Sequence, residues 1–160
     1  MSDIATFFDV DNFAADLALF DGDLATEDGI KTAVIISLFT DARASDDDIL
    51  PAGVTWRRGC WTDLLGNDPT DIIGSKLWLL SREKMTPNLY RRAEDYARDA
   101  LNWMLEDQVA QGVIVEAFEV LPRIPGRGGV LGLYVRIERA DAPAIDFRFD
   151  KLWSATANAV

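Results

Sequence analysis

The sequence predicts an α+β fold in which an antiparallel sheet carries helices on one face. Strand-like segments lie near the two ends of the chain and helical segments lie between them, so the two kinds of element are segregated. Residues 88–110 place apolar side chains three and four positions apart, which is typical of a helix packed on a core. Residues 145–150 alternate between apolar and charged side chains, which is typical of a half-buried strand.

The N-terminal part is predicted to form a β-hairpin followed by a helix. Residues 4–10 are rich in Ile, Thr and Phe, and residues 13–20 alternate more weakly, so both favour strands. Thr26 is expected to cap a helix that ends near residue 40. Apolar side chains cover nearly all of this helix, which indicates that it is central or covered by a partner chain.

Residues 44–71 are predicted to form a long irregular loop, and a loop of this length in a compact domain is usually functional or interacting. Trp and Arg, the residue types enriched in interface hot spots, are concentrated in it at Trp56, Arg57, Arg58 and Trp61. We therefore predict an interaction surface in this loop. The sequence is equally compatible with tryptophans that only attach the loop to the core.

The middle of the chain is predicted to contain two helices separated by a tight break. Residues 75–84 favour a short apolar helix, and Thr86 then offers an N-cap to a second helix over residues 88–110. The outer face of this second helix carries charged pairs four positions apart, such as Glu94 and Arg98.

The C-terminal part is predicted to form a three-stranded antiparallel meander. Residues 113–121, 130–139 and 145–150 have strand patterns, and the connections between them contain Pro or Gly and suit hairpins. Together with the N-terminal hairpin, this meander gives a sheet that about three helices should cover.

Composition narrows the possible functions of what is expected to be a single domain over residues 1–160. The net charge of −11 disfavours general binding to nucleic acid or to anionic membranes. No apolar run approaches the ~18 residues of a membrane span, so no membrane insertion is expected. The chain has no histidine, which excludes Ser-His-Asp triads and histidine zinc sites, and no cofactor is expected. A single cysteine, Cys60, permits no intrachain disulfide and suggests a reducing cytoplasm.

Four phrases of the sequence are more specific. They are GDLATEDGIKTAVIISLFTDARA at residues 22–44, RRGCW at residues 57–61, IGSKLWLLSREKMTP at residues 73–87 and FRFDKLW at residues 147–153. In this order they resemble the Mu-like phage baseplate protein family, which is similar to the lysozyme-like baseplate wedge proteins of larger contractile phages.

The resemblance implies a structural, non-enzymatic role in the virion. Such proteins are expected in the tail baseplate, assembled in the cytoplasm of the bacterial host. Their expected partners are other baseplate wedge proteins, hub or spike proteins, and the tail sheath or tube. They are expected to help initiate sheath assembly.

The resemblance also suggests individual contact residues. The wider family carries a Glu-Pro-Arg motif at the end of its long helix, used in wedge contacts, and only Glu106 matches that motif here. Arg82 and Glu83 belong to the SREK phrase of the Mu-like branch. The last strand carries Phe147 and Phe149, and its terminal position predicts an unpaired sheet edge that accepts a strand from another chain. The predicted interface residues are Trp56, Arg57, Arg58, Trp61, Arg82, Glu83, Glu106, Phe147 and Phe149.

Two alternatives belong to other functional classes. The lysozyme-like label suggests peptidoglycan hydrolysis, which needs two carboxylates across a cleft, one of them protonated. Glu83 is the best candidate acid, but ion pairing with Arg82 or Lys84 favours the ionised carboxylate, and the sequence identifies no second carboxylate. The other alternative is an adaptor that binds a host protein through the tryptophan-rich loop.

Overall fold

The computed structural model describes residues 29–64, 72–81, 83–120 and 129–154, together with six short strands before residue 28. The strands are β1 (Asp3–Ile4), β2 (Thr6–Asp9), β3 (Ala14–Leu17), β4 (Leu19–Phe20), β5 (Asp23–Leu24), β6 (Thr26–Glu27), β7 (Gly112–Val120), β8 (Val130–Glu138) and β9 (Ile145–Ser154). The helices are α1 (Ile30–Phe39), α2 (Pro87–Leu101) and α3 (Trp103–Glu106), with 3-10 turns η1 (Trp61–Leu64) and η2 (Leu77–Leu80).

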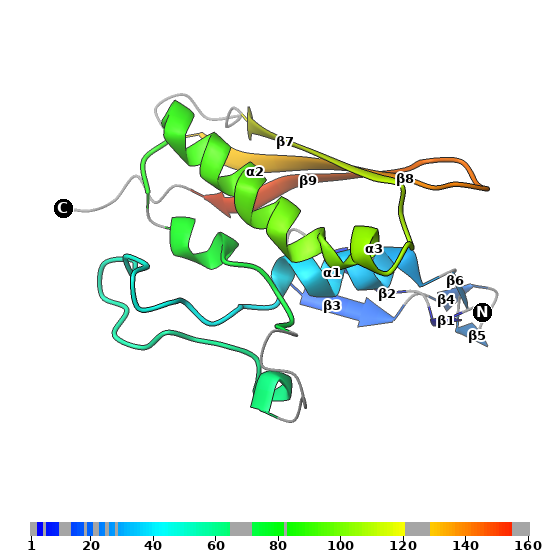
Figure 1. Cartoon of the computed structure of the whole chain (residues 1–160), viewed down its shortest axis with the longest axis horizontal. Helices are drawn as coiled ribbons and strands as arrows, with labels where there is room; N and C mark the ends of the chain where they lie inside the picture. Colours follow the sequence, from blue (N-terminus) through cyan, green and yellow to red (C-terminus); the bar gives the residue numbers. More distant parts are fainter. Residues whose placement is uncertain are drawn as a thin grey trace.

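The α+β class is confirmed. The last three strands form an antiparallel sheet in the order β7-β8-β9, and α2 lies along one face of it (Figure 1). None of the helices in the described part of the chain has the length and apolar character of a membrane span.

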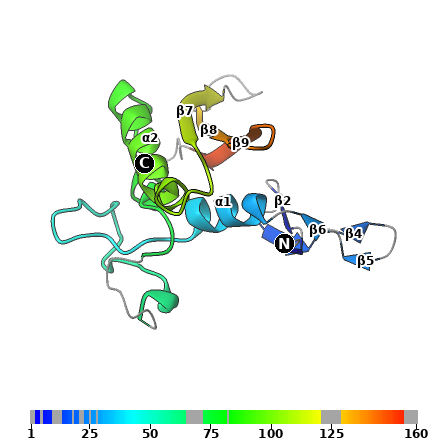
Figure 2. The ribbon, with the colours of Figure 1, turned by 45° about the vertical axis from the view of Figure 1, so that its right-hand side comes forward.

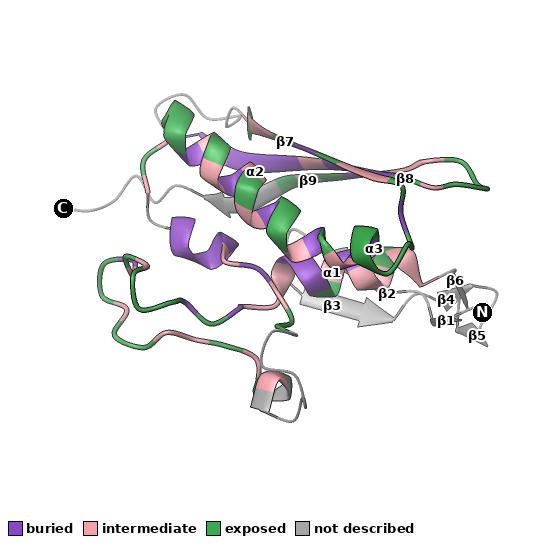
Figure 3. Ribbon diagram, in the orientation of Figure 1, coloured by how far each residue is buried: buried purple, intermediate pink, exposed green. Residues whose placement is uncertain are grey.

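The core lies between this sheet and the helices. One row of β8 faces it, and each member of that row is at most 2% exposed: Leu131, Leu133, Val135 and Ile137. The apolar stripe of α2 packs onto this row through Leu89, Ala93, Ala97 and Leu101. Figure 3 shows the buried positions of α2 on the side of the helix that faces the sheet. The apolar side chains that recur with the period of a helix in α2 therefore pack against those that recur with the period of a strand in β8.

The N-terminal hairpin forms but does not join the main sheet. β2 pairs antiparallel with β3 in a separate two-stranded sheet, and Figure 2 shows β2 and β6 beside α1, away from β7–β9. The expected cap at Thr26 is wrong, because Thr26 lies in β6 and pairs with Ile4. The helix begins at Ile30 after Gly29, whose φ of 82° turns the chain in a conformation that suits glycine.

The central helices are shorter than predicted. Among the described residues of 75–84, helical structure is limited to the single turn η2, whose four side chains are all buried. Thr86 is confirmed as the cap of α2, and its side-chain oxygen accepts a hydrogen bond from the Leu89 backbone N–H at 3.3 Å. The continuous helix to residue 110 is wrong: α2 ends at Leu101, where the chain tightens so that the Asn102 N–H bonds to the Asp99 carbonyl three residues back. Two helices longer than one turn are therefore described, rather than about three.

The meander is confirmed almost at its predicted bounds. β7 pairs with β8 from Gly112 opposite Glu138 to Val120 opposite Val130. β9 continues to Ser154, and its register against β8 shifts between Leu131 and Leu133. Both pairings are antiparallel, so β7 and β9 form the two edges of the sheet.

Candidate interaction surface

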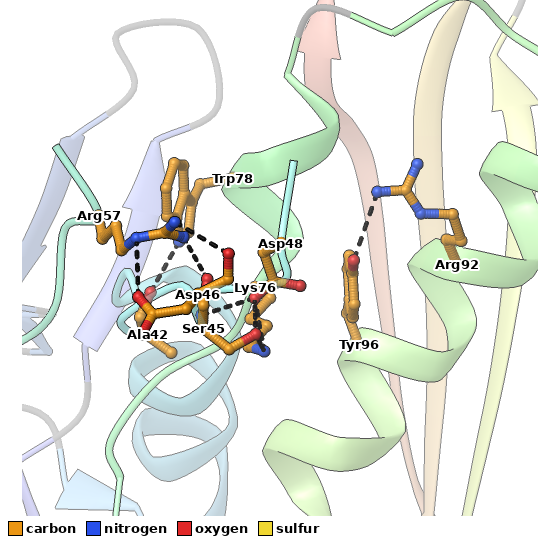
Figure 4. A network of polar contacts seen from close by, with 9 residues as sticks. All are labelled: Ala42, Ser45, Asp46, Asp48, Arg57, Lys76, Trp78, Arg92 and Tyr96. Atoms are coloured by element: carbon orange, nitrogen blue, oxygen red, sulfur yellow. Dashed lines mark hydrogen bonds and ion pairs between the residues drawn. The ribbon is translucent and has the colours of Figure 1, made fainter. Parts of the chain in front are cut away.

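The predicted interaction loop of residues 44–71 follows α1 after a short connection, and Arg57 joins two segments of this loop. The guanidinium of Arg57 donates to the backbone carbonyls of Ser45 and Asp46, the latter at 3.0 Å, and pairs with the Asp46 carboxylate at 3.3 Å (Figure 4). The Ala44 N–H returns a bond to the Arg57 carbonyl at 2.9 Å. Arg57 is thus used to build the loop.

A second anchor joins the loop to the segment before η2. Lys76 Nζ lies 2.7 Å from a carboxylate oxygen of Asp48, which also accepts hydrogen bonds of 2.7 Å from the Ser45 N–H and hydroxyl. Partial burial alone would raise the pKa of Asp48, but the bonds from Lys76 and Ser45 outweigh it and lower this pKa below its usual value. Asp48 is therefore ionised at neutral pH, and the anchor is charge-assisted.

The third anchor is Trp78 of η2, which is 2% exposed. Its indole Nε1–H donates to the Ala42 carbonyl at 2.8 Å, and the guanidinium of Arg58 lies 4.5 Å from the ring centre. Arg58 also pairs with Asp41 at 2.7 Å. Trp78 therefore links the connection between α1 and the loop to the core, and the guanidinium of Arg58 from the loop stacks on its ring.

The two loop tryptophans behave differently from the arginines beside them. Trp56 is 64% exposed and Trp61 is 71% exposed, while Ile49 in the same loop is 87% exposed. Large apolar side chains held outward on an anchored loop are available to a partner. Trp78, rather than Trp56 or Trp61, fastens the loop to the core.

The remaining predicted contact residues on the helices are not brought together. Glu83 lies before α2 and pairs with Arg92 at 2.6 Å, whereas Glu106 lies at the end of α3, where it accepts a bond from Asn102 at 2.6 Å. The fifteen residues of α2, roughly 22 Å of helix, separate the two. Arg82 lies outside the described residues.

Phe147 and Phe149 point into the core. Phe147 is 8% exposed, and the Phe149 ring meets Phe39 of α1 edge-on with 5.0 Å between ring centres. These two side chains therefore pack within the chain, and β9 offers other molecules its outer face and its backbone edge.

An apolar pocket of about 290 Å³ lies between α1, the end of α2 and residues 72–74, and sequence patterns did not predict it. Ile36, Ile72 and Ile73 line it and are 48%, 53% and 38% exposed, and Trp103 donates to the Ser37 hydroxyl at 3.0 Å beside it. The signal in the sequence was the all-round apolar character of α1. Ile36 of this helix lines the pocket together with residues 72–74, which directly follow the predicted loop.

The described residues provide no cluster of three or more Cys, Asp or Glu side chains suited to a metal ion. What they provide is an anchored loop with outward aromatic side chains, a nearby apolar pocket and the outer edge of β9. This arrangement suits contacts with other macromolecules.

Comparison with known proteins gives consistent results. The family model described as phage protein GP46 matches residues 30–144. The chain is 40% identical to the baseplate protein gp46 of Escherichia phage Mu, over 93% of this chain and 95% of that protein. It is also 40% identical to the Mu-like prophage FluMu protein gp46 of Haemophilus influenzae, over 73% of this chain and 76% of that protein. No solved structure matches the chain.

Proposed function

The chain belongs to the phage protein GP46 family, and we propose that it is a structural component of a phage tail baseplate. We further propose that it links wedge and hub proteins to a contractile sheath and helps to initiate sheath assembly. The observation that carries the baseplate role is the match to the Mu baseplate protein over nearly the full length of both chains. The protein would then reside in the virion tail after assembly in the host cytoplasm.

A structural role also suits the chemistry of the described side chains. Glu83, the best candidate acid for hydrolysis, is held by the guanidinium of Arg92 at 2.6 Å, so its carboxylate is engaged within the chain. The net charge of −11 favours protein partners over nucleic acid.

The anchored loop is proposed as the surface for wedge or hub proteins, and co-purification with the tail proteins encoded beside it tests this. We expect the double substitution Trp56→Ala and Trp61→Ala to weaken the complex at least tenfold, because exposed tryptophans that become buried in an interface commonly contribute about 2 kcal/mol each. The dissociation constant, measured by titration calorimetry of the purified partners, is the readout.

The matched control is Ile114→Ala, which removes a 41% exposed apolar side chain from β7 instead of the loop. It should leave the affinity unchanged. If the wild-type chain forms no complex with any of the tail proteins, the baseplate proposal fails. Equal affinity of the wild type and the double variant contradicts the loop assignment alone.

The edge of β9 is proposed as the acceptor of a strand from the sheath. On β7, the Val115 carbonyl and the Ala117 N–H bond to side chains of α2. The backbone N–H and C=O groups of these two residues therefore point away from β8. Backbone groups of successive residues alternate in direction, and the register carries this alternation across β8 to β9. The N–H and C=O of Asp146 and Arg148 therefore point outward, away from β8. No bond from another described segment reaches them.

This geometry allows the edge to be blocked without breaking the sheet. Arg148→Pro removes an outward N–H while leaving the bonds to β8, which Phe147 and Phe149 make. We expect this variant to remain folded by circular dichroism but to lose the nucleation of sheath polymers, measured as assembled sheath in the presence of the other baseplate proteins.

Arg148→Ala is the control, because it removes the side chain that lies 4.6 Å from the Phe118 ring but keeps the backbone N–H. It should nucleate sheath like the wild type. Normal sheath assembly by a folded Arg148→Pro variant would show that strand addition at β9 is not used.

A further inference from the structure

The sheet has a second edge, β7, and an open edge of nine residues would also accept a strand. Strand addition at both edges would allow the chain to pair with further copies of itself or with the wrong partner. The way in which β7 is covered therefore decides how many strands the sheet accepts.

Side chains of α2 occupy two of the outward backbone groups of β7. Glu94 Oε1 accepts a hydrogen bond from the Ala117 N–H at 3.1 Å, and Arg98 Nη2 donates to the Val115 carbonyl at 3.4 Å. These are the N–H and C=O groups at the centre of the edge, and an incoming strand would need both of them.

The spacing of the two elements makes this possible. Glu94 and Arg98 are four residues apart on the helix, which is about 6 Å, and Ala117 and Val115 are two residues apart on the strand, which is about 6.8 Å. Tyr90, one helical turn earlier, continues this row, because its side chain hydrogen-bonds to Glu119 of β7. Burial, together with the charge and hydrogen bond of Glu119, raises the pKa of Tyr90. One side of α2 thus runs alongside the edge of β7, and the spacing of its side chains is close to the spacing of the outward backbone groups of the strand.

The two covering side chains are themselves fixed. Arg98 pairs with Glu94 at 3.1 Å and with Asp95 at 2.9 Å, and the helix beneath them is held by buried Ala93 and Ala97. The bonds to β7 therefore come from side chains whose conformations are already restricted, which lowers the entropy lost in covering the edge.

We propose that Glu94 and Arg98 close the β7 edge to strand addition, so that the sheet can be extended only at β9. This inference rests on the proposed function, in which β9 accepts a strand from the sheath. It adds that the sheet accepts one strand and no second one at β7. The excluded occupant is an extended segment of a second copy of this chain, whose β7 edge would pair antiparallel with the first.

The test is the self-association of the isolated protein, measured by sedimentation velocity over a range of concentrations. We expect the variant Glu94→Ala with Arg98→Ala to dimerise with a dissociation constant at least tenfold lower than that of the wild type. The control, Arg91→Ala with Asp99→Ala, removes one positive and one negative charge from exposed positions of the same helix. It should behave as the wild type does. Equal association of all three proteins overturns the proposal.

A second measurement shows whether the backbone is opened locally. We expect Glu94→Ala to speed hydrogen exchange of the Ala117 amide at least tenfold by NMR, while Glu94→Gln keeps it slow, because the glutamine side chain still offers an oxygen acceptor. Unchanged exchange in Glu94→Ala also overturns the proposal. Both measurements use the protein alone, so their outcome is independent of whether a baseplate complex forms.

Discussion

Replacing Trp78 with alanine is expected to lower the free energy of unfolding by about 4 kcal/mol, the largest effect of any single substitution considered for this chain. The side chain is 2% exposed and packs in a cluster with Ala44 and Leu79. Its removal leaves a large cavity beneath the loop, and it also deprives the Ala42 carbonyl of its donor at 2.8 Å. Urea denaturation followed by circular dichroism measures the change.

Trp78→Phe separates these contributions. Phenylalanine keeps an aromatic ring in the cluster but has no N–H, so the expected loss is about 1–3 kcal/mol from the unpaired carbonyl of Ala42. Trp56→Ala, at a side chain that is 64% exposed, should change the stability by less than about 0.5 kcal/mol. A Trp78→Ala protein as stable as the wild type would refute the assignment of Trp78 as the anchor of the loop.

Gly74→Ala is expected to destabilise the chain by about 3 kcal/mol. Gly74 has a φ of 112°, which side chains rarely adopt, and an added Cβ would lie 2.4 Å from the Thr40 carbonyl oxygen. The clash is with backbone and falls beside the bridge between Asp41 and Ser75, where the Ser75 N–H bonds to that same oxygen at 2.9 Å. No side-chain rotation relieves it, so the segment leading to η2 must move away from the end of α1.

Gly53→Ala is the matched control for this prediction. Gly53 also has a positive φ, 81°, but it is exposed at the outer part of the loop. The conformational cost alone, about 1 kcal/mol, is expected there. Urea denaturation of the two variants compares them directly, and equal losses would show that backbone crowding at Gly74 contributes nothing.

The sequence alone determined the elements whose faces are strongly periodic. The alternation in β8 and β9 and the apolar stripe of α2 encode which side of each element is buried, and all three elements begin close to their predicted positions, although α2 ends earlier and β9 later than predicted. The cap at Thr86 was also predictable, because the threonine hydroxyl and the following proline act on their immediate neighbours. The α+β class follows from the order of these elements.

The tertiary structure decided what covers each face. The sequence predicted the same interface role for Arg57 and Arg58 as for Trp56 and Trp61. In the structure the two arginines bond within the chain, whereas the two tryptophans stay exposed. The apolar character of Ile36 became part of a pocket only when residues 72–74 folded beside it.

The same holds for the two sheet edges. Glu94 and Arg98 read in the sequence as a surface ion pair, and only the docking of α2 beside β7 turned them into partners of the Val115 and Ala117 backbone. The physical reason is that the periodicity of an element shows which of its faces is apolar. It does not show which distant segment of the chain packs on that face. That choice depends on the packing of the whole domain.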